Sequence, residues 1–193
     1  MGETIRLTFD FSWTSADNTN LFRVGLFDTT NAITADNWSG SNAIGAWKGY
    51  YTFVRDDSTS GNLAREATLT TASGTNGPTS SSSGETAITS PSNTTRFNIL
   101  NGVTYQGMFE VTRTTASSTT TLFTLKGGST THFSVTGIDS TTPYNTFDSV
   151  VIKTGAAAPV ALFDNVQLTV IPEPAAATLG AFGLLALLRR RRN

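Results

Sequence analysis

The chain has 193 residues, a formal net charge of −1 and no cysteine. Without cysteine it can form no disulfide, no thiolate zinc site and no cysteine nucleophile. From residue 172 onward it carries four arginines and one glutamate, so residues 1–171 have nine basic and 13 acidic residues and a net charge of −4. This acidic body lacks the basic surface that nucleic-acid binding requires, so no nucleic-acid partner is expected.

Residues 4–13 show the clearest strand pattern. The apolar residues at odd positions from Ile5 to Trp13 alternate with polar ones, which predicts a half-buried strand of an antiparallel sheet. Gly, Ser, Thr and Asn are abundant and only 14% of residues are charged, a composition that favours short strands joined by polar turns. Further strands are predicted over residues 21–28, 43–54 and 62–69, and a long polar loop over residues 74–95.

The alternation resumes in the second half of the chain. Asn101-Gly102 is a hairpin signal between residues 97–99 and a long strand over residues 103–113. The remaining predicted strands cover residues 119–126, 131–138, 147–153 and 160–170.

These patterns predict an all-β fold. Helical periodicity is absent before residue 175, and about nine to eleven strands with polar connections indicate a two-sheet antiparallel β-sandwich over residues 1–171. A jelly roll is the preferred form. The first and last strands are both long and well patterned, as expected of strands that pair near a sheet centre or edge.

Residues 172–193 form a separate tail. Pro172-Glu173-Pro174 cannot continue a strand, because proline lacks a backbone donor and restricts the residue before it. Residues 175–188 are apolar helix formers. A helix over them would be about 21 Å long at about 1.5 Å per residue, short of a hydrocarbon core about 30 Å thick. The tail is thus a marginal transmembrane helix, better suited to a removable signal than to a permanent anchor.

Four arginines follow the apolar segment. Arginine runs stay on the cytoplasmic side of a membrane, so this cluster places the body outside. The cluster consists of Arg189, Arg190, Arg191 and Arg192.

The Pro-Glu-Pro motif, the short apolar segment and the arginine run resemble the PEP-CTERM sorting domain of Gram-negative bacteria. All three elements occur in order, over about 22 of the 193 residues. The resemblance implies that a membrane-embedded exosortase recognises the motif, cuts there and transfers the body to the cell surface or the extracellular matrix. Residues 1–5 show no signal peptide, so we expect an upstream start or a removed signal sequence.

Evidence for catalysis is weak in this sequence. His132 is the only histidine and is expected to be an ordinary strand residue, and no cofactor or metal site is predicted. Calcium held by Asp28 and Asp36 is an alternative that rests on two acids alone. The remaining acidic candidates are Asp56, Asp57, Glu66, Glu85 and Glu110. Their spacing shows no tight carboxylate pair of the kind that glycoside hydrolysis needs.

Aromatic residues gather between positions 38 and 53. Exposed aromatic rings beside Asp and Asn bind sugars by stacking and hydrogen bonding, which makes this region a candidate glycan site. The candidate residues are Trp38, Trp47, Tyr50, Asp36 and Asn37.

Core packing is the competing interpretation of these aromatic residues. Trp47 and Tyr51 would then share the core face with Phe53, and Tyr50 alone would face solvent.

The body also resembles a concanavalin A-like lectin/glucanase sandwich, in residues 7–11, 23–28 and 163–166. The resemblance implies a fold and transfers no site residue. The leading hypothesis is an exported, non-enzymatic β-sandwich protein sorted by its tail, with extracellular polysaccharide as a further candidate partner. The alternatives are a lectin-like glycan-binding module and a polysaccharide-active enzyme.

Overall fold

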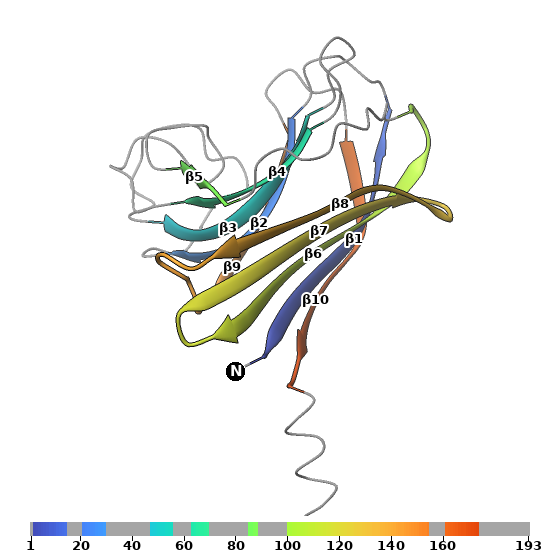
Figure 1. Ribbon diagram of the computed structural model, residues 1–193. Helices are drawn as coiled ribbons and strands as arrows, with labels where there is room; N and C mark the ends of the chain where they lie inside the picture. The colour runs from blue at the N-terminus through green and yellow to red at the C-terminus, as the bar shows by residue number, and fades with distance from the viewer. Residues whose placement is uncertain are drawn as a thin grey trace, which may run out of the picture.

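The computed structural model describes residues 2–14, 21–29, 47–55, 63–69, 85–88, 100–154 and 161–173. These residues form ten strands in two antiparallel five-stranded sheets, and none of them is helical (Figure 1). Sheet A has the order β10-β1-β6-β7-β8, with β1 (Thr4–Trp13), β6 (Thr104–Thr115), β7 (Ser118–Gly127), β8 (Thr130–Asp139) and β10 (Ala161–Ile171). Sheet B has the order β5-β4-β3-β2-β9, with β2 (Leu21–Thr29), β3 (Trp47–Arg55), β4 (Leu63–Leu69), β5 (Glu85–Ala87) and β9 (Ser149–Thr154).

The all-β prediction is confirmed for the described residues. Every strand predicted between residues 4 and 69 and between residues 103 and 170 is present, with its ends moved by a few residues. The loop predicted over residues 74–95 is wrong at Glu85–Ala87, which pair with the edge of β4 as β5. A three-residue strand is too short to show alternation, and only its partner defines it. Residues 97–99 and 174–193, with the expected C-terminal helix, lie outside the described residues.

The two sheets share one hydrophobic core. Its largest contribution from sheet A is the odd-numbered face of β1, whose residues from Leu7 to Trp13 are buried as the alternation predicts. Fully burying such a side chain stabilises the fold by about 1.5–3 kcal/mol. The opposing core residues from sheet B include Val24, Leu26, Tyr50 and Val54.

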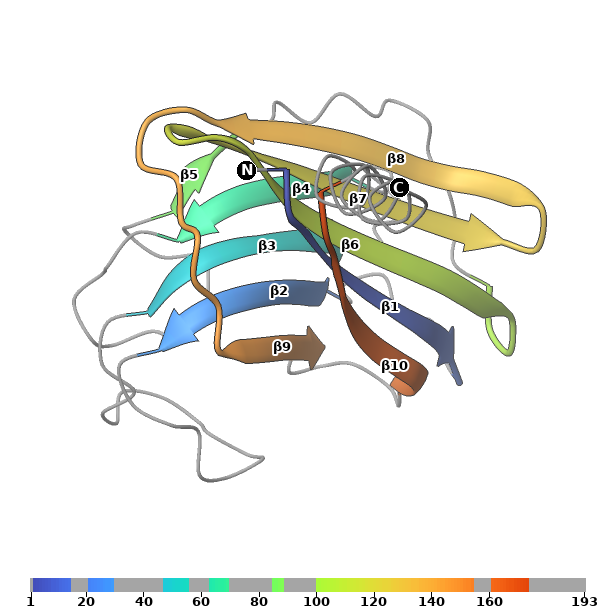
Figure 2. The same cartoon turned by 90° about the horizontal axis from the view of Figure 1, so that it is seen from below.

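The first and last described strands pair with each other. β1 is hydrogen-bonded to β10 on one side and to β6 on the other, so β10 is the edge strand of sheet A (Figure 2). The β1–β10 ladder shifts register between Thr8 and Asp10, where β10 carries one extra residue and Asn165 has a φ of 51°. This is a β-bulge, a device that bends a strand and re-aims its side chains.

A buried polar cluster joins the two sheets beside the core. The hydroxyl of Tyr50 in β3 donates a hydrogen bond to Asp139 Oδ2 at the end of β8, at 3.0 Å. The same hydroxyl accepts a hydrogen bond from the Tyr144 amide at 2.8 Å. Asp139 Oδ1 accepts two more, from the amides of Thr141 at 2.9 Å and Thr142 at 3.1 Å. Burying a carboxylate is costly unless it is hydrogen-bonded in this way.

Removing the Tyr50 hydroxyl should destabilise the protein. Tyr50→Phe leaves a buried carboxylate oxygen and the Tyr144 amide each short of a partner, which should lower the free energy of unfolding by about 1–3 kcal/mol. Tyr105→Phe is the control, because that hydroxyl accepts a hydrogen bond from the amide of Leu100, an exposed residue five positions earlier that precedes β6. Urea denaturation measures both, and equal losses would contradict an inter-sheet role for Tyr50.

The same cluster predicts sensitivity to alkaline pH. Burial raises the pKa of Tyr50 well above its usual 10.0, and the charge of Asp139 adds to this effect. The folded state therefore retains a proton that the unfolded chain releases near pH 10, so this stabilisation is complete below pH 10 and declines above it. Unfolding measured from pH 8 to 11 should show a steeper loss for the native chain than for Tyr50→Phe. The stability of the variant should still decline somewhat with rising pH, because burial also raises the pKa of Tyr144.

Candidate functional site

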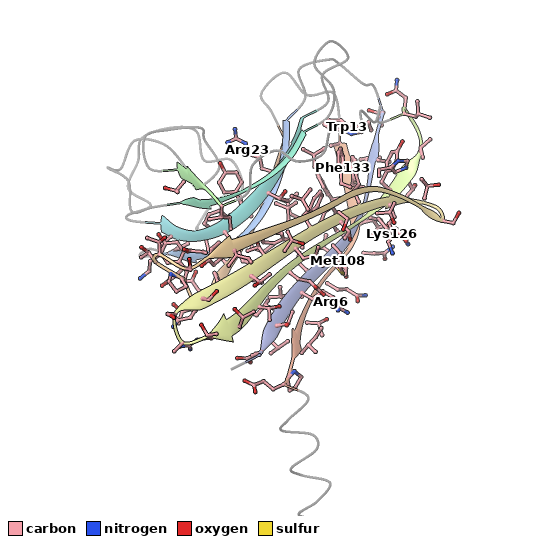
Figure 3. All side chains as sticks on the ribbon, in the orientation of Figure 1. Arg6, Trp13, Arg23, Met108, Lys126 and Phe133 are labelled. Carbon is pink, nitrogen blue, oxygen red and sulfur yellow. The ribbon has the colours of Figure 1, made fainter. Side chains whose placement is uncertain are left out.

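A polar groove of about 430 Å3 lies on the outer face of sheet A, opposite the core. Strand register aligns its side chains in rows across the sheet: Asp10 lies beside Gln106, which lies beside Lys126. The next row contains Gln167, Thr8 and Met108, followed by Thr124. Figure 3 shows Met108 and Lys126 on this sheet. The lining residues are Thr8, Phe9, Asp10, Gln106, Gly107, Met108, Thr124, Lys126, Asn165 and Gln167.

The bulge in β10 shapes one end of the groove. Asp10 and Asp164 are direct cross-strand partners, and two like charges in this position repel. Asn165 donates a hydrogen bond to each, from Nδ2 to Asp10 Oδ2 and from its backbone amide to Asp164 Oδ1, both at 2.7 Å. The amide side chain thus fixes the orientation of the Asp10 carboxylate at the groove.

The groove is chemically mixed. It combines one carboxylate, one ammonium group, three side-chain amides and two hydroxyls around the apolar side chain of Met108. Such a surface offers many donors and acceptors and little net charge. It therefore suits a neutral ligand rich in hydroxyl groups better than a strongly anionic or cationic one.

Asp10 and Asp164 are two carboxylates at cross-strand positions beside the groove. Glycosidases need one carboxylic acid and one carboxylate across the scissile bond. Here Asn165 donates a hydrogen bond to one oxygen of each carboxylate. Glu110, an acidic candidate from the sequence, instead accepts a hydrogen bond from Arg6 in an ion pair.

The predicted aromatic glycan site is not assembled by the described residues. Tyr50 is fully buried in the core, so its prediction as a sugar-binding residue is wrong. Trp47 is the first residue of β3, paired with Thr29. Trp38, Asp36 and Asn37 lie outside the described residues.

The face assignment within β3 is also wrong. Tyr51, expected on the core face, lies on the opposite face of sheet B from Tyr50. There it is buried against Phe27, with ring centroids 6.3 Å apart, and the Arg23 guanidinium lies 5.9 Å from its ring centroid. Figure 3 shows Arg23 on this outer side of sheet B. Shifting a strand assignment by one residue reverses both faces, which is the error made here.

The other candidate ligands have ordinary structural partners. Asp28 Oδ2 lies 3.4 Å from Lys48 Nζ and accepts a hydrogen bond from Thr146, while Asp36 lies outside the described part of the chain. Burial lowers the pKa of His132, whose ring packs edge-on against Tyr105. No group of three or more metal-ligating side chains occurs among the residues that the structure describes.

The Pro-Glu-Pro motif begins directly behind the last strand. β10 ends at Ile171, and Pro172 and Glu173 are the last described residues. Glu173 packs against Gly2, where an added Cβ would lie 2.9 Å from Glu173 Cγ. The Gly2 amide in turn donates a hydrogen bond to the Arg113 carbonyl. Pro174 and the four arginines lie outside the described residues. The part of the chain that the structure does describe contains no helix that is long and apolar enough to span a membrane.

Comparison with known protein families, curated proteins and solved structures finds no significant match to this chain.

The bulge residue can be tested by two substitutions. Asn165→Gly keeps the positive φ accessible and removes only the side-chain contact with Asp10. Asn165→Ala removes that contact and also places a Cβ in the left-handed region, which costs about 1–2 kcal/mol for an ordinary residue. We therefore expect Asn165→Ala to melt several degrees below Asn165→Gly in calorimetry. Identical melting temperatures would show that the positive φ carries no cost here.

Proposed function

We propose that this protein is an exported, exosortase-sorted cell-surface or extracellular-matrix protein with a non-enzymatic body. The body is a jelly-roll β-sandwich of the concanavalin-like kind. The observation that carries the proposal is the position of the Pro-Glu-Pro motif, which starts one residue after Ile171, the last residue of β10. Cleavage at the motif would therefore leave all ten described strands on the released part.

The tail's chemistry supports a temporary membrane stage. Its apolar run contributes only about −2 to −4 kcal/mol to insertion, which is marginal for a permanent span. The arginine cluster would hold the tail's end on the cytoplasmic side while the acidic body lies outside. The proposed partners are accordingly the membrane, an exosortase-type processing enzyme and, after release, extracellular polysaccharide.

Replacing the motif tests this proposal. The change of Pro172, Glu173 and Pro174 to alanine should leave the protein unprocessed and move most of it from the surface or medium to the membrane fraction. The host must produce an exosortase, and fractionation with immunoblotting measures the distribution. Thr178→Ala in the same tail is the control and should be sorted normally. Normal processing of the triple variant would refute the proposal.

A second candidate function is a lectin-like glycan-binding module, favoured by the polar groove on sheet A. Its volume lies within the range of about 300–1,000 Å3 typical of ligand sites. This site differs from the aromatic one predicted from the sequence, because its residues come from β1, β6, β7 and β10. Extracellular polysaccharide is the ligand class that its amides and hydroxyls fit.

Affinity electrophoresis in gels containing neutral polysaccharides (dextran, xylan and galactomannan) tests the groove. At least one should retard the native chain. Gln106→Ala with Gln167→Ala should weaken that binding by about tenfold or more, because each lost hydrogen bond is worth about 1 kcal/mol. Thr120→Ala with Thr136→Ala, on the same face outside the groove, should bind normally. Equal retardation of both double variants would exclude the groove.

The same samples address the enzymatic alternative. Release of reducing sugars by the native chain, lost in Asp164→Asn, would identify a polysaccharide-active enzyme instead.

A further inference from the structure

The edge strand β10 is unusually exposed. Among the described residues it pairs only with β1, and its residues 164–170 are exposed on both faces. Three large aliphatic side chains lie in this stretch: Val166 is 46% exposed, Leu168 54% and Val170 53%. Leu168 and Val170 are cross-strand partners of Leu7 and Ile5, so they continue the core-facing side of β1 out to the edge.

Natural edge strands are usually protected against pairing with other chains. Lysine, proline or an inward-pointing charge within the strand is the common device. Residues 165–171 contain none of these, since the one charge of β10 is Asp164 at the bulge. The segment therefore presents an uncharged edge with an exposed aliphatic stripe, in regular register from Gln167 to Ile171 beyond the bulge.

The sequence of this segment is symmetric about Leu168. Val166 and Val170 lie two residues to either side, and the polar residues Gln167 and Thr169 lie between them. Paired residues of antiparallel strands point to the same face. If two copies pair antiparallel about Leu168, valine meets valine, leucine meets leucine and glutamine meets threonine.

We propose that β10 is a self-association edge, at which a second copy of this chain pairs antiparallel with its own β10 about Leu168. Sheet A of one copy then continues into sheet A of the other across a two-fold axis. In this register Asp164 lies opposite Pro172 of the other copy, so no two like charges meet. Centring the pair on Gln167 instead would place Asp164 opposite Val170, which disfavours that register.

The composition of the edge favours a second copy over an unrelated partner. Its side chains complement themselves, and it carries no charge that would select an acidic or basic peptide. Strand pairing over seven residues buries less than the roughly 1,000 Å2 of a stable interface, so we expect a weak, concentration-dependent dimer. This inference does not depend on sorting by the tail.

Cysteine cross-linking tests the register directly, because the chain has no cysteine of its own. Residues opposite each other in an antiparallel pair have Cα atoms about 4.5–5.5 Å apart, within the range that a disulfide spans. The full chain carrying Leu168→Cys, in dodecyl maltoside, should convert to a covalent dimer under mild oxidation. Ile138→Cys is the matched control: Ile138 is 60% exposed on β8, the other edge strand of sheet A, and this variant should stay monomeric.

Charge substitution gives a second measurement that needs no oxidation. Leu168→Lys and Leu168→Glu should each lose the concentration-dependent dimer in sedimentation velocity, and an equal mixture of the two should recover it. The position is exposed, so neither variant should disturb folding. Two outcomes would overturn the proposal: a native chain that stays monomeric at high concentration, or dimers of both charge variants as stable as the native one, which would indicate association through the tail.

Discussion

The hydrogen bond from Tyr50 to Asp139 joins the two sheets where the chain crosses from one to the other. β8 of sheet A ends at Asp139 and β9 of sheet B begins at Ser149, so residues 140–148 connect the two sheets. The hydroxyl of Tyr50 donates a hydrogen bond to Asp139 and accepts one from the Tyr144 amide. The Phe147 ring packs against the Tyr50 ring, with the two ring centroids 6.0 Å apart. At the end of the connection Asp148 accepts a hydrogen bond from the Thr29 amide in β2.

The groove and the Pro-Glu-Pro motif both lie on or beside sheet A. The pairing of β1 with the edge strand β10 brings the first described strand against the last, so residues about 160 positions apart in sequence form the same ladder. The groove includes residues from both of these strands, and the Pro-Glu-Pro motif follows the second of them. Glu173 of the motif therefore lies beside Gly2, which precedes β1. For a sorted protein, this arrangement would present the motif at the end of a finished domain.

The sequence predicted much of the fold because alternation is strong where one face of a strand is buried. The pattern in β1 identified four core residues. Tyr50 and Tyr51 show the limit of this reasoning. Adjacent aromatic residues fit either face equally well, and the deciding partner of Tyr50 is Asp139, 89 residues away.

The groove could not be found from sequence for a related reason. Its residues come from four strands, share no motif and become neighbours only through strand register. The bulge that brings Asn165 to Asp10 leaves only a slight signal, an asparagine at a position that needs a positive φ. The tail is the opposite case, because its three elements are contiguous and its resemblance to a sorting signal rests on the sequence alone; it stays a prediction.

The central claim is that a complete β-sandwich is exported and then separated from its tail. Intact-mass spectrometry of the protein recovered from the cell surface or medium tests this most directly. We predict a C-terminus within or next to Pro172-Glu173-Pro174, with all residues of β10 retained. Recovery of the full chain through Asn193 from the surface, or a C-terminus upstream of Ile171, would contradict the account.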